Sequence, residues 1–181
     1  MTTYCQYVLK HPEDEFNKHY HDTQYGFPLE DDDLLFERLI LEINQAGLSW
    51  ITILKKADNF RRAYDGFKIE TVASYRESTR ARLLSDTGII RNKLKINAAI
   101  ENARRILVLR QEYGSFKGWL DAHHPRSKDE WVELFKENFK FVGGEIVNEF
   151  LMSTGYLPGA HEESCSIYPI VRSQNPPWAM E

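Results

Sequence analysis

The sequence predicts an all-α protein, and three observations carry this prediction. Apolar residues recur at the spacing of one helix face in several stretches, and the alternation typical of β-strands is absent. Gly or Pro stands at the breaks between these stretches. The chain has 181 residues and no internal repeat, which suits one domain. We therefore expect a single all-α domain over residues 1–165 and an extended tail over residues 166–181, which contains Pro169, Pro176 and Pro177.

The first two helices are predicted from charge and apolar spacing. Asp31–Asp33 form an acidic first turn, which suits the positive end of a helix dipole. The helix Leu34–Asn44 follows, and it is strongly apolar. After a break at Gly47, the helix Leu48–Tyr64 again has apolar residues at helical spacing.

Four more helices are predicted in the second part of the chain. The longest is Asn92–Tyr113, in which apolar residues from Ile96 to Leu109 mark one face. The other three are Thr79–Ser85, Lys128–Asn138 and Glu145–Thr154.

The composition is that of a globular protein, with 42% hydrophobic and 28% charged residues. No apolar run approaches the roughly 18–20 residues that a membrane-spanning helix needs, and no signal-peptide pattern is present. We therefore expect a cytoplasmic protein without membrane contact. The net charge of −4 excludes a global basic field, so any nucleic-acid binding must come from a local patch.

Both cysteines and two of the histidines have the spacing of a zinc site. His161 and Cys165 are four residues apart, which places two metal ligands on one side of a helical turn or compact loop. Cys5 and His21 could supply the other half, and the site would then tie the N-terminal segment to the C-terminal one. The alternative is two reduced thiols and unconnected surface histidines.

Glu42 is the charged residue in the otherwise apolar run Leu39–Ile43. A buried carboxylate is costly unless it is hydrogen-bonded or paired, and desolvation raises its pKa. Glu42 either caps a neighbouring helix or pairs with an internal Arg, or it points into a pocket and accepts hydrogen bonds from a ligand. Gln45 and Trp50 follow closely, and a carboxylate, an amide and an indole near one helix end would recognise a flat, amine-bearing heterocycle. Trp50 by itself is equally typical of core packing.

Residues 79–96 have the pattern of a helix, a tight turn and a second helix. Gly88 can supply the positive φ of such a turn, and the second helix N-terminus offers free N–H groups that suit phosphate oxygens. Arg91, Lys93 and Lys95 gather at this point. The pattern is typical of a helix-hairpin-helix that holds a nucleic-acid backbone without reading its bases. An ordinary turn with a solvated basic face is the alternative.

Taken together, these motifs resemble the 3-methyladenine DNA glycosylase I family. The resemblance is carried by the run Glu42–Lys56, by Tyr20-His21-Asp22, and by the segments Thr87–Arg91 and Phe139–Gly143. It extends from about Cys5 to Cys165, which is nearly the whole chain.

The resemblance implies a fold and a function. The fold would be an all-α helix-hairpin-helix with a structural zinc joining the two ends of the chain. The function would be that of a monofunctional, monomeric N-glycosylase that flips 3-methyladenine out of alkylated double-stranded DNA and hydrolyses its glycosidic bond. Two other functions stay open: a non-catalytic zinc-stapled DNA-binding protein, and a nucleobase-binding small-molecule enzyme, which the net charge of −4 suggests.

The resemblance also implies roles for individual residues. The zinc ligands would be Cys5, His21, His161 and Cys165, and the base would contact Tyr20, Glu42 and Trp50, with Glu42 recognising the base. Gly88, Arg91 and Lys93 would lie at the DNA backbone.

No residue is assigned to activate water. The stretch Arg91–Arg105 lacks the Asp of other helix-hairpin-helix glycosylases and contains only Glu101. The chain departs from the family pattern at Tyr7 and Tyr25, where the family usually has Trp, and across Gly144–Asn148. Where these positions border the pocket, we expect its shape and damage spectrum to differ.

Overall fold

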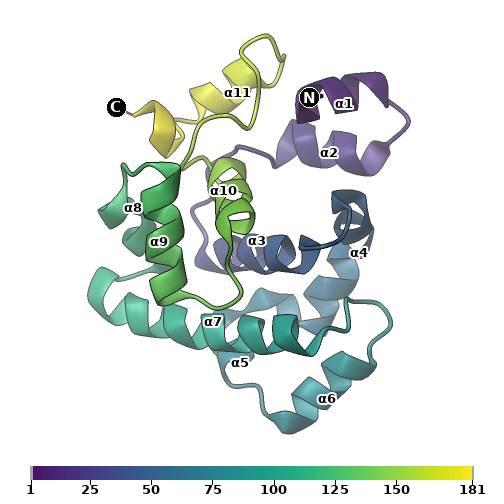
Figure 1. Cartoon of the computed structure of the whole chain (residues 1–181), viewed down its shortest axis with the longest axis vertical. Coiled ribbons are helices and arrows are strands. Elements are labelled where there is room, and N and C mark those ends of the chain that lie inside the picture. Colours follow the sequence, from purple (N-terminus) through teal and green to yellow (C-terminus); the bar gives the residue numbers. More distant parts are fainter. Residues whose placement is uncertain (1, 181) are drawn as a thin grey trace.

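The computed structural model describes residues 2–180, and all regular secondary structure in this range is helical (Figure 1). This confirms the predicted all-α class. The elements in chain order are α1 (Tyr4–Lys10), α2 (Glu15–Thr23), α3 (Asp32–Gln45), α4 (Trp50–Ala63), the short 3-10 helix η1 (Asp65–Phe67), α5 (Ile69–Ala73), α6 (Glu77–Ser85), α7 (Lys93–Tyr113), α8 (Phe116–His123), α9 (Lys128–Asn138), α10 (Gly144–Ser153), α11 (Tyr168–Ser173) and η2 (Pro177–Ala179).

Six of these helices, α3, α4, α6, α7, α9 and α10, are the predicted ones with small shifts at their ends. Helix α4 starts at Trp50 rather than Leu48 because Ser49 is extended and acts as its N-cap. Helices α1, α2, α5, α8 and α11 were not predicted. In α2 the buried residues are Asn17, Tyr20 and His21, so the buried face is polar and aromatic and has no apolar stripe.

Helix α3 lies at the centre of the molecule and contacts α4, α5, α7, α8 and α10. Every residue of Leu35–Asn44 is buried, so its charged side chains need partners inside the protein. Arg61 Nε of α4 donates to Glu37 Oε1 at 2.8 Å. Arg38 Nη1 donates to the carbonyl oxygen of Ser153, at the end of α10, at 3.1 Å. These contacts attach α4 and α10 to α3.

The turn between α6 and α7 has the predicted helix–turn–helix order, but its details correct two predictions. The φ of Gly88 is not positive; the turn needs glycine because a Cβ there would come within 3.0 Å of Asp86 Oδ1 and 3.3 Å of Asn59 Cβ. The backbone N–H groups at the start of α7 are not all free, since the Asn92 side chain accepts those of Leu94 and Lys95.

Lys95 is also not part of an exposed basic cluster. It is 4% exposed, and its ammonium donates to the carbonyl oxygens of Asn44 at 2.8 Å and Ala46 at 2.7 Å. It therefore caps the C-terminal end of α3 and ties α7 to it. Arg91 and Lys93 are exposed.

The prediction of an extended tail was wrong for the described part of residues 166–181. Residues 168–173 form α11, and Trp178 N–H donates to the carbonyl oxygen of Gly155 at 3.1 Å. The prolines do not prevent this, because Pro169 lies in the first turn of α11 and Pro177 in the first turn of η2, where a missing N–H is tolerated. Both ends of the chain lie on the same side of the molecule (Figure 1). None of the described helices is long and apolar enough to cross a membrane.

Candidate active site and metal centre

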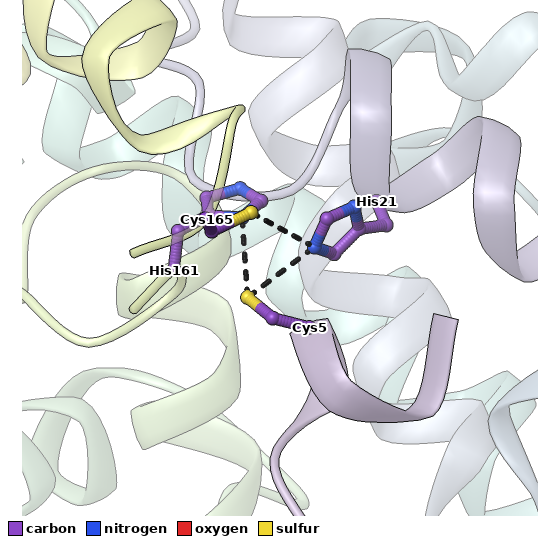
Figure 2. Close-up of side chains that lie close together, drawn as sticks. All are labelled: Cys5, His21, His161 and Cys165. Carbon is purple, nitrogen blue, oxygen red and sulfur yellow. Dashed lines mark hydrogen bonds between the residues drawn. The ribbon is translucent and has the colours of Figure 1, made fainter. Parts of the chain in front are cut away.

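Cys5, His21, His161 and Cys165 converge from three segments of the chain (Figure 2). Cys5 lies on α1 and His21 on α2, whereas His161 and Cys165 lie in the loop that follows α10. Cys5 Sγ is 3.3 Å from His21 Nε2 and 3.7 Å from His161 Nδ1. Cys165 Sγ is 3.8 Å from each of the same two nitrogens. Residues 156 positions apart thus meet at one point.

The spacing of these four atoms fits a tetrahedral zinc ion. With Zn–S bonds of about 2.3 Å and Zn–N bonds of about 2.0–2.1 Å, a tetrahedron has S···N edges of about 3.6 Å. The four sulfur–nitrogen distances of 3.3, 3.7, 3.8 and 3.8 Å bracket this value. All four ligand atoms lie within 4.8 Å of one another. The group could therefore hold a metal ion.

The remaining nitrogen of each histidine ring has a partner that orients the ring toward the centre. His21 Nδ1 lies 2.7 Å from Asp22 Oδ1, and His161 Nε2 lies 2.7 Å from the carbonyl oxygen of Tyr25. Because both partners are acceptors, each ring carries its proton on that side and turns a lone pair toward the two sulfurs. Burial lowers the pKa of His161, which favours the neutral ring that a metal requires.

A cavity of about 900 Å³ lies beside the four-residue cluster, which contributes Cys5 and His161 to its wall. Of the residues predicted to contact the base, the structure brings Tyr20, Glu42 and Trp50 together in this cavity. The wall also contains Gln45, whose side-chain amide donates to the carbonyl oxygen of Leu48 at 2.9 Å. The cavity wall is formed by Thr3, Tyr4, Cys5, Tyr20, Tyr25, Glu42, Gln45, Trp50, Glu145, Glu149, Gly159, Ala160, His161, Glu162 and Glu163.

Glu42 is the buried carboxylate of this cavity and is 4% exposed. Unlike Glu37 and Arg38 on the same helix, it makes no hydrogen bond to another residue within 2–180. Burial, followed by the negative charge of Glu149, raises the pKa of Glu42 to about 8, and Arg38 partly opposes this rise. A buried carboxylate without a partner is costly, so its free oxygens are available to a ligand that donates hydrogen bonds.

Aromatic rings form the rest of the pocket around Glu42. Tyr20 and Trp50 meet edge to face with ring centroids 5.1 Å apart, and Tyr4 and Tyr25 meet in the same way at 5.3 Å. The Tyr20 hydroxyl and the Trp50 indole N–H are buried and have no hydrogen-bond partner in the described part of the chain. Arg38 lies over the Tyr20 ring, 5.1 Å from its centroid. Flat apolar faces and unused polar atoms thus surround one carboxylate.

The site also contains two residues that the sequence analysis did not assign to it. Tyr25 was noted only as a departure from the family pattern, and Glu149 was not noted at all. The Tyr25 hydroxyl donates to Glu149 Oε2 at 3.1 Å. Glu149 is a charged residue between the buried Val147 and Phe150, which is the same signal that singled out Glu42. Of the other departures, Glu145 borders the cavity, whereas the Tyr7 hydroxyl donates to Asp14 outside it.

Glu101 lies away from this cavity. Arg105 Nε donates to Glu101 Oε1 at 3.1 Å, and Glu101 lines a separate hollow with Arg80 and Arg104.

Comparison with known proteins supports one family. The model of the family described as methyladenine glycosylase matches residues 10–130. The chain is 37% identical over 169 residues to DNA-3-methyladenine glycosylase 1 of Escherichia coli (strain K12), covering 83% of this chain and 90% of that protein. It is 31% identical over 184 residues to DNA-3-methyladenine glycosylase of Haemophilus influenzae, covering 91% of this chain and 97% of that protein.

Solved structures agree with this comparison. This chain is similar to a solved structure of 3-methyladenine DNA glycosylase I from Staphylococcus aureus, described as showing the structural basis of 3-methyladenine recognition. The TM-score is 0.79 and the sequence identity is 32%, over 86% of this chain and 92% of that chain. A crystal structure of 3-methyladenine DNA glycosylase I is similar with a TM-score of 0.77 and 35% identity, over 85% of this chain and 94% of that one.

The raised pKa of Glu42 predicts a pH-dependent stability. Between pH 4.5, the ordinary pKa of this group, and about pH 8, the unfolded chain ionises the carboxyl group while the folded protein keeps its proton. The free energy of unfolding therefore falls as pH rises through this range, and the decrease is complete above about pH 8. Glu42→Gln removes this decrease. We expect the variant to gain several degrees in Tm over the parent at pH 9 and fewer at pH 6, at about 2–4 °C per kcal/mol.

Thermal unfolding of both proteins at the two pH values measures this difference. Glu145→Gln is the control, because this carboxylate is exposed at the cavity rim and should shift Tm little at either pH. The same Tm difference at pH 6 and pH 9 would mean that Glu42 ionises normally in the folded protein.

Proposed function

The chain belongs to the methyladenine glycosylase family, and from this premise we infer that it is a DNA base-excision repair enzyme that hydrolyses the glycosidic bond of 3-methyladenine. The observation that carries this function is the buried carboxylate of Glu42, which has no hydrogen-bond partner among residues 2–180 and lies in one cavity with Tyr20 and Trp50. The substrate would be alkylated double-stranded DNA, and we expect the enzyme to act as a cytoplasmic monomer.

The cavity suits the electronic state of this substrate. Methylation at N3 makes the adenine nucleoside cationic, so the base is already a good leaving group and needs no strong protonation. The enzyme must instead extrude the nucleotide from the duplex and hold the base. The faces of Tyr20 and Trp50 can stack on a flat cation and favour it through their ring quadrupoles.

Glu42 supplies the polar recognition in this proposal. Its ionised carboxylate accepts hydrogen bonds from the exocyclic amine of the base and lies near the positive charge. A bound cation favours the ionised form and so lowers the pKa of Glu42 from its raised value in the free protein. Water then attacks the sugar carbon as the neutral base leaves. Glu101 is no candidate for activating this water, because it lies outside the cavity.

We propose that the Cys/His cluster holds a structural zinc ion. The support is the tetrahedral spacing of Cys5, His21, His161 and Cys165, together with the acceptors that orient both histidine rings. When bound, the metal supplies a cross-link between α1, α2 and the loop after α10. Because that loop also forms part of the cavity wall, the cross-link would hold the pocket in shape.

We further propose that the turn between α6 and α7 is the helix-hairpin-helix that holds the DNA backbone. Arg91 and Lys93 are exposed there and can contact phosphates. Gly88 would shape the turn rather than bind phosphate through its N–H, because that N–H donates to Asp86 Oδ1 at 2.8 Å. Lys56 supports the turn by donating to the carbonyl oxygens of Thr87 and Gly88, at 3.3 Å each.

The decisive test of the proposed function is Glu42→Gln. The substitution keeps the size of the side chain but turns one acceptor into a donor that faces the amine of the base. We expect normal folding, unchanged binding to undamaged duplex, and 3-methyladenine release slower by about one to two decades, since a hydrogen bond to a charged group contributes roughly 1.5–3 kcal/mol. Chromatography of bases released from methylated DNA measures the rate.

Glu137→Gln, which changes an exposed glutamate of α9 outside the cavity wall, is the matched control and should keep the parental rate. Release at the parental rate by Glu42→Gln would make Glu42 a structural carboxylate and place the pocket elsewhere. No release by the parent protein itself would favour a non-catalytic DNA-binding protein or an enzyme with a small-molecule substrate.

The zinc proposal predicts about one zinc ion per chain by metal analysis, as a closed four-ligand site requires. Cys165→Ser should lower Tm by more than about 10 °C, because a structural zinc ion contributes several kcal/mol of folding free energy. Ser164→Ala, an exposed neighbour on the same loop, should change Tm little. Full stability after exhaustive chelation, with no metal bound, would overturn the proposal.

The hairpin proposal predicts a loss of DNA binding that does not depend on sequence. Arg91→Ala together with Lys93→Ala should weaken binding to all duplexes alike. The slope of the logarithm of the binding constant against the logarithm of the salt concentration should become shallower by about two, roughly one for each lost phosphate contact. Binding of free 3-methyladenine should not change. Lys136→Ala, an exposed lysine on α9, is the control. Unchanged DNA affinity of the double variant would move the DNA-binding surface elsewhere.

A further inference from the structure

We propose that Glu149 is a second carboxylate of the base pocket and that it makes the pocket select positively charged bases over neutral ones. This inference rests on the proposed function and adds a specificity-determining residue to the same cavity.

Glu149 and Glu42 reach the cavity from different helices. Glu42 comes from α3 and Glu149 from α10, and these two helices are in contact. The Tyr25 hydroxyl donates to Glu149 Oε2 and fixes the position of the carboxylate. Within residues 2–180 no other donor reaches Glu149, so Oε1 keeps its lone pairs for a ligand.

The charge of the cavity is negative. Its wall contains five glutamates, namely Glu42, Glu145, Glu149, Glu162 and Glu163, and includes no Lys or Arg. Two cations lie near the cavity but outside its wall. Arg38 donates to the Ser153 carbonyl oxygen and lies over the Tyr20 ring, and Lys128 pairs with Glu145 at 3.4 Å. With a neutral base the two carboxylates keep opposing each other's ionisation, whereas a cationic base is attracted by both carboxylates and favours their ionised forms.

Two further atoms indicate that the cavity is built for a ligand and is more than a group of acidic residues. Tyr20 is 3% exposed, lines the cavity, and has a hydroxyl with no hydrogen-bond partner in the described chain. The Trp50 indole N–H is in the same state. Polar atoms buried without partners are costly, and the Glu42 carboxylate, which is 4% exposed and lines the same cavity, is also without a partner within residues 2–180.

One member of this pair departs from the family pattern. Tyr25 stands where the family usually has Trp, and Glu149 lies directly after the segment Gly144–Asn148, in which the chain also departs from that pattern. The Tyr25 hydroxyl and the Glu149 carboxylate meet in one hydrogen bond at the cavity wall. The geometry therefore assigns Glu149 as a specificity-determining residue and Tyr25 as the residue that positions it.

The test compares two free ligands that differ in charge, using the purified full chain as isolated. The first probe is 3,9-dimethyladeninium, a permanent cation that represents the alkylated nucleoside. The second is 3-methyladenine at pH 8, where the free base is neutral. Calorimetry or fluorescence titration gives both Kd values. We expect the parent protein to prefer the cation.

Glu149→Gln should lower this preference about tenfold and leave the affinity for the neutral probe within about twofold, because it removes a charge and keeps the shape. Tyr25→Phe should lower the preference less, by about threefold, since the carboxylate stays but loses its fixed position. Glu137→Gln removes the same charge from an exposed position on α9 outside the cavity wall, where solvent screens it, and should leave the preference unchanged.

Equal weakening of both probes by Glu149→Gln would show a structural role and would overturn the inference. An unchanged preference in Glu149→Gln would also overturn it, while the proposed function would stand. If the parent protein bound neither probe, the proposed function of the cavity would fail and the inference with it.

Discussion

The burial of α3 is the constraint on which the rest of the structure depends. Ten consecutive residues, Leu35–Asn44, are shielded from solvent, and the neighbouring helices must supply partners for the polar groups among them. Helix α4 pairs with Glu37, the end of α10 accepts from Arg38, and α7 caps the helix end. Among the charged residues of this stretch, Glu42 is the exception, because it has no hydrogen-bond partner within residues 2–180. The surrounding helices leave space beside it, and that space is the cavity.

The two ends of the chain close this cavity, and Tyr25 joins them. Its backbone carbonyl accepts from His161 in the loop after α10, and its hydroxyl donates to Glu149 on α10. Next to it, Gly26 has a φ of +83°, and a Cβ there would come within 2.8 Å of Ala160 Cβ. The Cys/His cluster and the pocket therefore share one wall, and a change in the position of that loop affects both.

Periodicity predicted α4 and α7, because their apolar residues recur at the helical repeat, and α3 was predicted from its acidic first turn and its nearly continuous apolar run. Periodicity did not predict α2, whose buried face is built from Asn17, Tyr20 and His21. In the site, Glu42 could be found because a charge interrupts an apolar run. The same signal at Glu149 is weaker, because the polar Asn148 stands beside it.

Other features depend on distant contacts that a local pattern does not contain. Lys95 looks like a member of a basic cluster in the sequence, and only the approach of the α3 carboxyl end shows that it is a helix cap. This cap has a mechanical consequence. The buried ammonium of Lys95 opposes sliding of α7 along α3, since such a shift would break its hydrogen bonds to the carbonyl oxygens of Asn44 and Ala46. In the proposed complex, in which Arg91 and Lys93 contact the DNA backbone, this cap would limit changes in the distance from the bound phosphates to the cavity. The DNA duplex, and not the protein, would then have to deform for a nucleotide to enter the cavity. This costs the least free energy for a nucleotide whose base stacking is already weakened by damage.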